Sequence, residues 1–296
     1  MRLELEVLAA SAAQRPTTPR PNDLRTIDRK LADLRAAVRE LGSVVVAFSA
    51  GADSTLVAKV AADELGERAL AVTSASASLA ERELREALEY AESLGVQHRV
   101  VYTQELENPD YLANPTNRCY HCKTELYGHL TALARAEGYS HVANGLNVDD
   151  LGDYRPGLQA ANEHGVRAPL QESGLTKADV RAISKLLGVP TWDKPAMACL
   201  SSRVPYGEAI TRDKLSQIDR AEQFVRDLGY RQLRVRHHGQ VARLELPRDE
   251  MLGFMERHAD VVAAHFKTLG FQYVTLDLQG FRSGSMNEVL AARAGV

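Results

Sequence analysis

A run of small and hydroxyl-bearing residues, Ser49–Ser54 (SAGADS), follows a short apolar segment and precedes a helical pattern. Such a strand–turn–helix junction presents free backbone N–H groups and the positive end of a helix dipole, so it is suited to bind an anion. Small residues let the backbone approach a phosphate, and Ser49 and Ser54 add hydroxyl donors. A Walker A loop has a lysine after its last glycine, but none follows Gly51 directly, and Lys59 lies a full turn into the helix. The run therefore predicts phosphate binding without γ-phosphoryl transfer.

Three cysteines form a second group of residues that could bind a metal or react. Cys119 and Cys122 form a C-x-x-C pair, and Cys199 lies far downstream near Arg203. Structural zinc takes four ligands, and His121, inside the pair, is badly placed to join its neighbours. Three thiolates match a [4Fe–4S] cluster with one iron left open. The alternative is that the pair consists of buried small residues or a redox couple and that Cys199 is unrelated to it.

The composition limits the class of protein. The chain has 296 residues, 36 Lys and Arg against 39 Asp and Glu, a net charge of −3 and 45% hydrophobic residues. These values are typical of globular proteins and exclude a disordered chain or a disulfide scaffold. No apolar stretch approaches the ~18 residues of a membrane span, and the first 20 residues lack a signal-peptide core. We expect a cytoplasmic protein without a membrane partner, and the charge disfavours nucleic acid as a partner.

Strand and helix patterns alternate along the first two thirds of the chain. Short β-branched runs predict strands buried on both faces, and apolar residues spaced by three or four predict helices. Their alternation predicts βαβ units, and hence an α/β fold with a parallel sheet. The predicted strands are 44–48, 69–73, 97–102 and 141–145, and the predicted helices are 24–41, 55–65, 79–94 and 120–137.

The pattern changes after Val189. An irregular, proline-containing stretch at 191–208 precedes a helix at 211–228, two strands at 232–236 and 241–246, a further helical segment and a strand at 271–276. This order of elements predicts a second, smaller α+β domain. The predicted division is a loose tail at 1–22, a first domain at 23–193 and a second domain at 194–296.

The SAGADS run resembles the S-G-G-x-D-S pyrophosphate loop (PP-loop) of the N-type ATP pyrophosphatases. In that family ATP is cleaved between the α and β phosphates, and the loop holds the leaving pyrophosphate. Ala50 replaces the first glycine of the pattern. Alanine still permits close approach of the backbone unless φ is positive at that position.

Several separated segments together resemble the LarE family of ATP-dependent sulfur transferases, which mature the nickel-pincer nucleotide cofactor of lactate racemase. They are the pyrophosphate loop and residues 117–123, 144–157, 198–203 and 234–239. In that family ATP adenylates a carboxylate of a pyridinium dicarboxylate mononucleotide, and sulfur then displaces AMP to give a thiocarboxylate. One branch sacrifices the sulfur of a cysteine at the position of Cys199. Another branch has three cysteines and a [4Fe–4S] cluster that carries an additional sulfide, and this chain matches it better.

The resemblance implies a set of site residues, the cofactors ATP, Mg²⁺ and a [4Fe–4S] cluster, and assembly into a homo-oligomer. It implies catalytic roles for Asp53 and Cys199, ATP binding by Ser49, Gly51, Asp53, Ser54, Thr73 and Asn144, cluster ligation by Cys119, Cys122 and Cys199, and substrate binding by Ser202, Arg203, Glu222, Arg234 and Arg236. Asp149, Asp150 and Arg155 lie in a polar loop that could hold Mg²⁺ or the nucleotide. Arginine suits an anionic nucleotide because its guanidinium forks around phosphate oxygens.

Other functions remain open at this point. A tRNA thiolase of the same superfamily would need a basic surface, which the net charge of −3 disfavours. A non-catalytic nucleotide-binding module would leave the cysteines and residues 198–203 unexplained. An ammonia-using synthetase such as those making NAD would not need Cys199, and the chain shows no glutaminase domain. Within the sulfur-transferase interpretation, Cys199 as a sacrificial donor is the alternative to a cluster.

Overall fold

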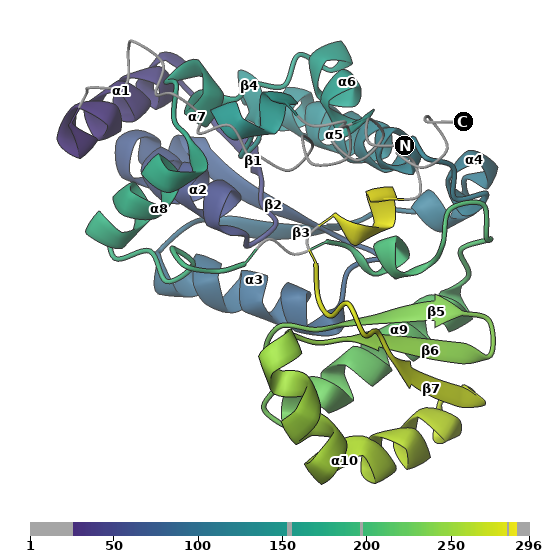
Figure 1. The fold of residues 1–296 in the computed structure, drawn as a ribbon. Helices are drawn as coiled ribbons and strands as arrows, with labels where there is room; N and C mark the ends of the chain where they lie inside the picture. Colours follow the sequence, from purple (N-terminus) through teal and green to yellow (C-terminus); the bar gives the residue numbers. More distant parts are fainter. Residues whose placement is uncertain (1–25, 153–155, 196–197, 283, 289–296) are drawn as a thin grey trace, which may run out of the picture.

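The computed structural model describes residues 26–152, 156–195, 198–282 and 284–288 (Figure 1). The predicted tail at 1–22 lies outside these residues. Within the part that is described, no helix has the length and apolar character needed to cross a membrane.

A four-stranded parallel sheet forms the centre of the first half of the chain. Its strands are β1 (Val44–Ala47), β2 (Ala69–Ala75), β3 (His98–Tyr102) and β4 (His141–Ala143), in the spatial order β3-β2-β1-β4. All three neighbouring pairs are parallel, with Val44 opposite Ala69 and His141. The prediction of an α/β fold with a parallel sheet is confirmed.

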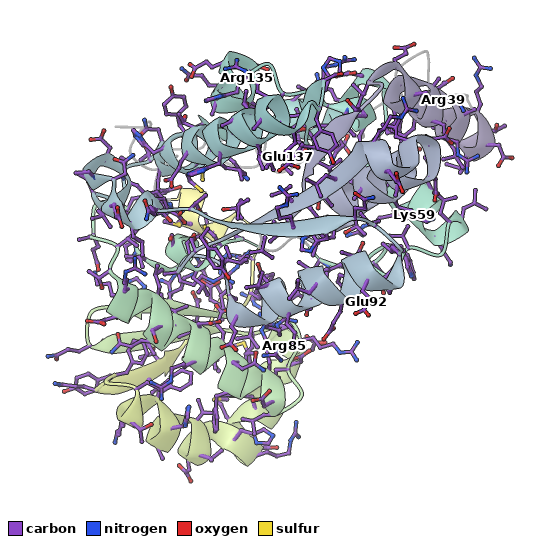
Figure 2. The ribbon with its side chains drawn as sticks, turned by 180° about the vertical axis from the view of Figure 1, so that it is seen from behind. Arg39, Lys59, Arg85, Glu92, Arg135 and Glu137 are labelled. Atoms are coloured by element: carbon purple, nitrogen blue, oxygen red, sulfur yellow. The ribbon has the colours of Figure 1, made fainter. Side chains whose placement is uncertain are left out.

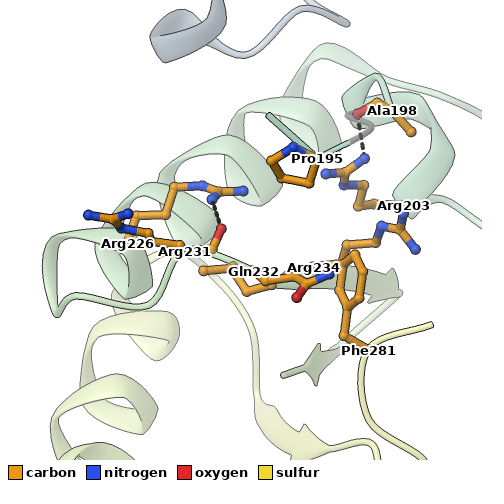
Figure 3. Close-up of a pocket in the computed structure, with 9 residues that line it drawn as sticks. Pro195, Ala198, Arg203, Arg226, Arg231, Gln232, Arg234 and Phe281 are labelled. Atoms are coloured by element: carbon orange, nitrogen blue, oxygen red, sulfur yellow. Dashed lines mark hydrogen bonds between the residues drawn. The ribbon is translucent and has the colours of Figure 1, made fainter. Parts of the chain in front are cut away.

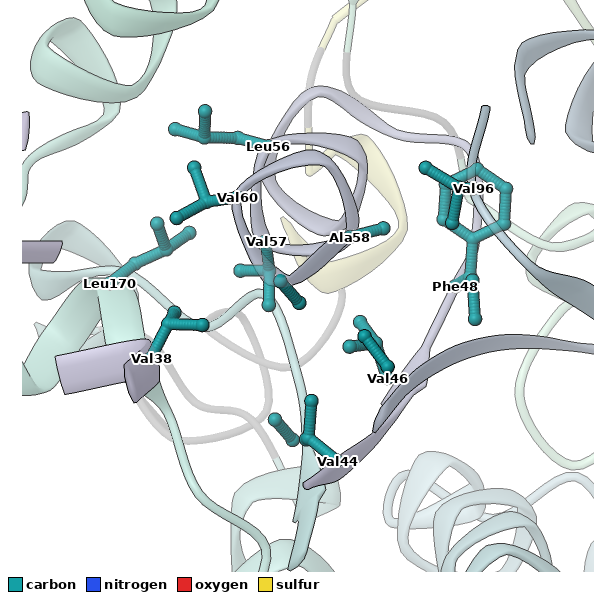
Figure 4. Packing of buried hydrophobic residues seen from close by; sticks show 14 of the residues in the cluster. Val38, Val44, Val46, Phe48, Leu56, Val57, Ala58, Val60, Val96 and Leu170 are labelled. Atoms are coloured by element: carbon teal, nitrogen blue, oxygen red, sulfur yellow. The ribbon is translucent and has the colours of Figure 1, made fainter. Parts of the chain in front are cut away.

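Helices cover both faces of this sheet. α1 (Ile27–Glu40), α2 (Ala52–Leu65), α3 (Glu81–Ser93), α7 (Pro169–Glu172) and α8 (Lys177–Leu186) pack on one face, and α5 (Arg118–Glu137) and α6 (Pro156–Glu163) pack on the other. Because side chains alternate along a strand, Val44 and Val46 join the first cluster (Figure 4), and Val45 joins the second. Charged side chains such as Glu92 on α3 and Arg135 on α5 are exposed on the outer surface (Figure 2).

A second, smaller sheet follows in the chain. β5 (Arg234–His238) and β6 (Val241–Glu245) form an antiparallel hairpin, and β7 (Tyr273–Leu276) adds to β6 in parallel. α9 (Arg212–Asp227) and α10 (Arg248–Thr268) supply the helical layer, and their buried side chains form a separate hydrophobic cluster with the sheet. The predicted second α+β unit is therefore present.

The two halves meet through a small apolar cluster of their own. Tyr111 of α4 (Pro109–Leu112) packs with Leu200 and Val204 and with Leu215 and Ile218 of α9. Short 3₁₀ helices complete the described chain: η1 (Gly66–Arg68), η2 (Glu105–Glu107), η3 (Val148–Gly152), η4 (Leu200–Arg203) and η5 (Ser285–Asn287). The segment that carries Cys199 is thus anchored on both halves.

Candidate active site

The pyrophosphate loop connects β1 to α2, as the sequence predicts. The backbone N–H of Ser49 donates to Ser54 Oγ at 3.2 Å, and the two serine hydroxyls lie 3.0 Å apart. Thr55 Oγ1 donates to the carbonyl of Gly51 at 2.8 Å, and Gly51 is the N-cap residue of α2. Local hydrogen bonds therefore fix the turn, and the N-terminus of a 14-residue helix faces the loop.

Ala50 has the positive φ that the sequence analysis named as the case in which alanine fits this position less well than glycine. Its φ is +55°, in the left-handed region, and its side chain is fully buried. For a residue with a Cβ this conformation costs about 1–2 kcal/mol. The replacement of glycine at this position is therefore strained, and the surrounding structure must hold it in place.

Asp53 is bound by two residues that the sequence analysis did not identify. Its Oδ2 forms an ion pair with Lys177 Nζ, and its Oδ1 accepts a hydrogen bond from Asn147 Nδ2 at 3.1 Å. Lys177 is the first residue of α8, directly after the N-cap Thr176, which forms a capping box with Asp179. The Thr-x-x-Asp spacing was the signal that could have placed Lys177 at a helix start.

Asp149 and Asp150 lie in the loop that reaches Asp53. Asp149 Oδ2 accepts the backbone N–H of Lys177 at 2.8 Å, and Asp150 Oδ2 accepts that of Asn147 at 3.0 Å. Their carboxylates order the two residues that contact Asp53. A role for them in Mg²⁺ binding stays a prediction, and Arg155 lies outside the described residues.

Gly145 explains why this loop can pack against the pyrophosphate loop. A Cβ at Gly145 would lie 2.7 Å from the backbone nitrogen of Ser54 and 2.9 Å from the carbonyl carbon of Asp53. Only glycine allows so close an approach of two backbones. The start of α2 and the residues after β4 are thus in direct contact.

Thr73 and Asn144 already have protein partners. Thr73 Oγ1 donates to the carbonyl of Phe48 at 2.9 Å and lies 2.8 Å from His98 Nε2. Asn144 Oδ1 accepts the backbone N–H of Leu146 at 3.0 Å. Both residues hold the strand ends around the loop, and their contact with ATP stays a prediction.

Both cysteines of the C-x-x-C pair lie inside α5, whereas the predicted helix at 120–137 contained only Cys122. The helix begins at Arg118, two residues earlier than expected, so Cys119 and Cys122 are three positions apart on one helical face. Burial raises the pKa of the Cys122 thiol to about 12. Cys119 is exposed to solvent on one side and surrounded by protein on the others. The partial loss of hydration, followed by the charge of Cys199, raises the pKa of its thiol.

Cys122 packs against the apolar cluster that contains Leu200, the residue directly after Cys199. The segment that carries it is docked against the start of α5, where Arg118 Nη1 donates to the carbonyl of Ser201 at 3.0 Å. Tyr111 and Ser201 add a buried hydroxyl pair at 2.6 Å. The fold therefore docks the segment that carries Cys199 against the helix that carries the pair, but among the described residues no three His, Cys, Asp or Glu side chains are arranged to share a single metal ion.

Arg203 and Glu222 form a buried, forked ion pair directly beside Cys199. Arg203 Nε and Nη2 lie 2.8 and 3.2 Å from the two carboxylate oxygens of Glu222, and Nη1 donates to the carbonyl of Cys199 at 3.0 Å. Ser202 Oγ donates to the same carbonyl at 2.7 Å. Three of the predicted substrate residues thus lie together around the backbone of Cys199.

Arg234 and Arg236 share one face of β5, as alternation predicts, and both face Glu245 on β6. Arg236 contacts its two oxygens at 2.9 and 3.0 Å, and Arg234 Nη1 lies 4.0 Å away. Burial, then the charges of Arg236 and Arg203, lowers the pKa of Arg234 to about 10. The sequence analysis missed Glu245, although the turn at Gly239-Gln240 sets a hairpin register that pairs it with Arg234.

A small recess opens between the Cys199 segment and α9 (Figure 3). Arg203, Arg226, Arg231 and Arg234 line it, together with Phe281 and the backbone around Ala198. Arg226 Nη1 donates to the carbonyl of Arg231 at 2.6 Å. Arg226 and Arg231 were not predicted, and this concentration of guanidinium groups suits an anionic ligand.

The chain is similar to one family model and to three proteins of known sequence. A family model described as NAD synthase matches residues 26–113, which include the pyrophosphate loop and end before Cys119. The pyridinium-3,5-bisthiocarboxylic acid mononucleotide synthase of Lactiplantibacillus plantarum is 41% identical over 268 residues, 90% of this chain and 97% of the relative. An uncharacterized protein of Synechocystis sp. is 51% identical over 268 residues, 89% of this chain and 99% of the relative. An uncharacterized protein of Methanocaldococcus jannaschii is 28% identical over 240 residues.

Proposed function

The chain belongs to the LarE family, and from that premise we propose that it is an ATP-dependent sulfur transferase acting on a pyridinium dicarboxylate mononucleotide. A substrate carboxylate attacks the α phosphorus of ATP, the bond to the β-phosphate oxygen breaks, and pyrophosphate leaves. A sulfur nucleophile then attacks the acyl carbon, and the bond to AMP breaks. The product is a thiocarboxylate of the kind used in nickel-pincer cofactor biosynthesis.

The observation that carries the proposal is the convergence of Cys199 on the C-x-x-C pair beside a cluster of arginines. Cys122 packs against the apolar cluster that contains Leu200, the residue after Cys199, and Arg203 donates to the carbonyl of Cys199. An ATP-binding module alone would need neither feature. A sulfur transferase needs a thiol or sulfide next to the place where an anionic substrate is held.

Support for the adenylation half comes from the loop. Its hydroxyl and backbone groups face the N-terminus of α2, and Lys177 brings a cation to Asp53 from a distant helix. A helix N-terminus and a nearby ammonium both favour the negative charge that develops on a leaving pyrophosphate. Mg²⁺ would add further charge compensation.

The three cysteines fit a [4Fe–4S] cluster better than a single metal ion. They supply three thiols from α5 and the segment before η4; burial raises the pKa of Cys119, and the charges of Arg118 and Lys123 offset part of that rise. A cluster held by Cys119, Cys122 and Cys199 would supply the sulfur to be transferred. In the alternative route Cys199 itself attacks the adenylate, and β-elimination at its Cβ–Sγ bond releases the thiocarboxylate and leaves dehydroalanine.

The substrate's anionic groups would bind at the arginine recess and at Ser202. Ala198 lines the recess, one residue before Cys199, so an anionic group of a mononucleotide bound at the mouth of the recess would lie near the sulfur donor. We also propose that the protein assembles into a homo-oligomer. Light scattering at micromolar protein concentration tests this, and a stable monomer would contradict it.

Product analysis tests the reaction itself. Purified protein, ATP, Mg²⁺ and the pyridinium dicarboxylate mononucleotide should yield AMP, pyrophosphate and a product in which sulfur replaces oxygen. Asp53→Ala should abolish the AMP while leaving the circular dichroism spectrum unchanged. ADP as the main nucleotide product would contradict the proposal, as would tight binding of tRNA with thiolation of that RNA.

Iron and sulfide analysis of anaerobically purified protein separates the two sulfur routes. With a cluster, Cys119→Ala and Cys122→Ala each lose iron and sulfur transfer. With a sacrificial Cys199, these variants still thiolate substrate once per chain, and Cys199 becomes about 34 Da lighter through loss of hydrogen sulfide.

A further inference from the structure

Lys194 links three separate parts of the molecule through one ammonium group. Its Nζ donates to the carbonyl of Ala50 at 3.0 Å and pairs with Glu86 Oε2 at 2.6 Å. It also lies 5.2 Å from the centre of the Tyr90 ring. Glu86 and Tyr90 are four residues apart on α3, and only 13% of the Lys194 side chain is exposed. A lysine held this firmly loses side-chain entropy, so its position needs a reason.

The carbonyl that Lys194 binds belongs to the strained residue of the pyrophosphate loop. Ala50 has a φ of +55° and is fully buried, so without Lys194 its carbonyl would lose a charged donor. Alanine prefers negative φ, and a rotation toward that region would turn this carbonyl and the neighbouring N–H groups. An anion site built from backbone donors works only while those donors keep their directions.

Lys194 also lies in the chain segment that leads to Cys199. It comes five residues before Cys199, in the stretch that connects α8 to η4. The same ammonium therefore connects the loop expected to bind ATP with the segment expected to deliver sulfur. No pattern in the sequence marks Lys194 as a partner of the loop, because the two are far apart in the chain.

We propose that Lys194 is a positioning residue that holds Ala50 in its left-handed conformation and so keeps the loop in its ATP-binding shape. The inference rests on the proposed use of ATP by this loop. It assigns to Lys194 a role exerted through Ala50, with no contact of its own to the reacting atoms. Glycine at position 50 would adopt the same conformation without strain and would not need the lysine.

A double-mutant cycle between positions 50 and 194 tests this. Lys194→Met, which keeps the length of the side chain and removes its charge, should weaken ATP binding about fivefold to tenfold. Ala50→Gly alone should change it less than twofold. The double variant Ala50→Gly/Lys194→Met should recover most of the lost affinity. ATP affinity is measured by titration calorimetry without substrate, and KM for ATP and kcat for AMP formation are measured with it.

A matched control comes from a second lysine over an aromatic ring. Lys185 Nζ lies 4.9 Å from the centre of the Trp192 ring and donates to no loop carbonyl, so Lys185→Met should leave ATP affinity unchanged. Lys194→Arg, which keeps a donor, should bind ATP better than Lys194→Met.

The cycle overturns the inference if the double variant binds ATP as weakly as Lys194→Met. In that case the lysine acts only by tying the chain to α3 through Glu86 and Tyr90. Wild-type affinity in Lys194→Met also overturns it. Protein that binds ATP with the expected coupling but forms no thiocarboxylate contradicts the proposed function alone, and protein that does not bind ATP contradicts both.

Discussion

The pyrophosphate loop and the cysteine–arginine junction solve the problem of binding an anion in opposite ways. The loop is one short stretch whose own backbone and hydroxyl groups form the site. The junction is assembled from η4, α9, β5 and β6, and the guanidinium groups of Arg203, Arg234 and Arg236 are buried. Arg203 and Arg236 are paired in a forked geometry with Glu222 and Glu245.

This difference indicates how much each region must rearrange when an anion binds. In the loop an anion meets donors that hydrogen bonds within the loop, together with Lys194, hold in place before binding, so binding needs little rearrangement. In the junction the carboxylates already occupy the best donors of Arg203 and Arg236. Arg234 has the weaker pairing, 4.0 Å from Glu245, and burial, then the charges of Arg236 and Arg203, lowers its pKa, so it is the member of this group that a ligand anion would stabilise. Ion pairs with Glu222 and Glu245 therefore stabilise the junction in the absence of a substrate.

Removal of the charge of Glu245 should produce the largest effect. Glu245 is fully buried and faces Arg234, Arg236 and Arg243. Glu245→Gln leaves these guanidinium groups without their common carboxylate, so we expect the free energy of unfolding to fall by about 3–5 kcal/mol. Urea denaturation measures it.

The control for Glu245→Gln is Glu137→Gln, which removes one partner of the exposed pair with Arg99 and should change stability little. If Glu245→Gln proves as stable as the wild type, the junction is not held by charge, and the contrast with the loop fails.

Gly145→Ala tests the loop by steric means. The added Cβ would meet the backbone of Ser54 and Asp53, and the displaced N–H groups would no longer match the phosphates. We expect AMP formation to fall about 100-fold, the order of magnitude caused by a displacement of about 1 Å in a site. Gly128→Ala on α5, where a Cβ meets only His164 at 3.9 Å, should keep full activity. Equal activity of the two variants would mean that the loop tolerates movement.

Cys122 allows a pH test of the junction. Because burial raises its thiol pKa to about 12, alkylation by iodoacetamide should be slow at pH 8 and should accelerate about tenfold per pH unit up to pH 11. Peptide mass spectrometry follows the reaction in cluster-free protein, with Cys122→Ser as the blank.

The folded state binds the proton of the Cys122 thiol more tightly than the unfolded state does. The contribution of this thiol to stability is therefore complete below the ordinary thiol pKa and decreases as the pH rises toward 12. Rapid labelling at pH 8 would contradict this environment.

The two regions were also unequally predictable from the sequence. The strand–turn–helix at 44–65 follows from a buried β-branched run and a small-residue turn, which are local patterns. The ion pairs depend on register and packing, so Arg203 and Glu222 were expected only as neighbours of a ligand and Glu245 was not expected at all. Lys177 and Lys194 reach the loop through tertiary structure, which no spacing in one sequence records. The helices α6 and α7 escaped prediction because they have 8 and 4 residues, too few for a clear apolar period.

The smallest expected effects come from substitutions at positions 50 and 51 of the loop, which distinguish a glycine needed for backbone conformation from one needed for contact with a ligand. Position 50 has a positive φ and carries alanine, whereas Gly51 has a φ of −82°, which any residue can adopt. Ala50→Gly relieves about 1–2 kcal/mol of strain and loses part of it to backbone entropy, so we expect a net gain of about 0.5 kcal/mol in the free energy of unfolding.

Gly51→Ala should behave in the opposite way. Its Cβ would lie no closer than 3.4 Å to Ser49 Oγ, so the fold accepts alanine, and stability should stay the same or rise slightly. ATP affinity should nevertheless fall, because the methyl group lies at the N-terminus of α2, where a phosphate approaches the backbone. Thermal unfolding and ATP titration on both variants measure the two effects. If Gly51→Ala binds ATP as the wild type does, glycine at this position does not serve ligand approach, and the interpretation of the loop as a phosphate site built from backbone groups is wrong.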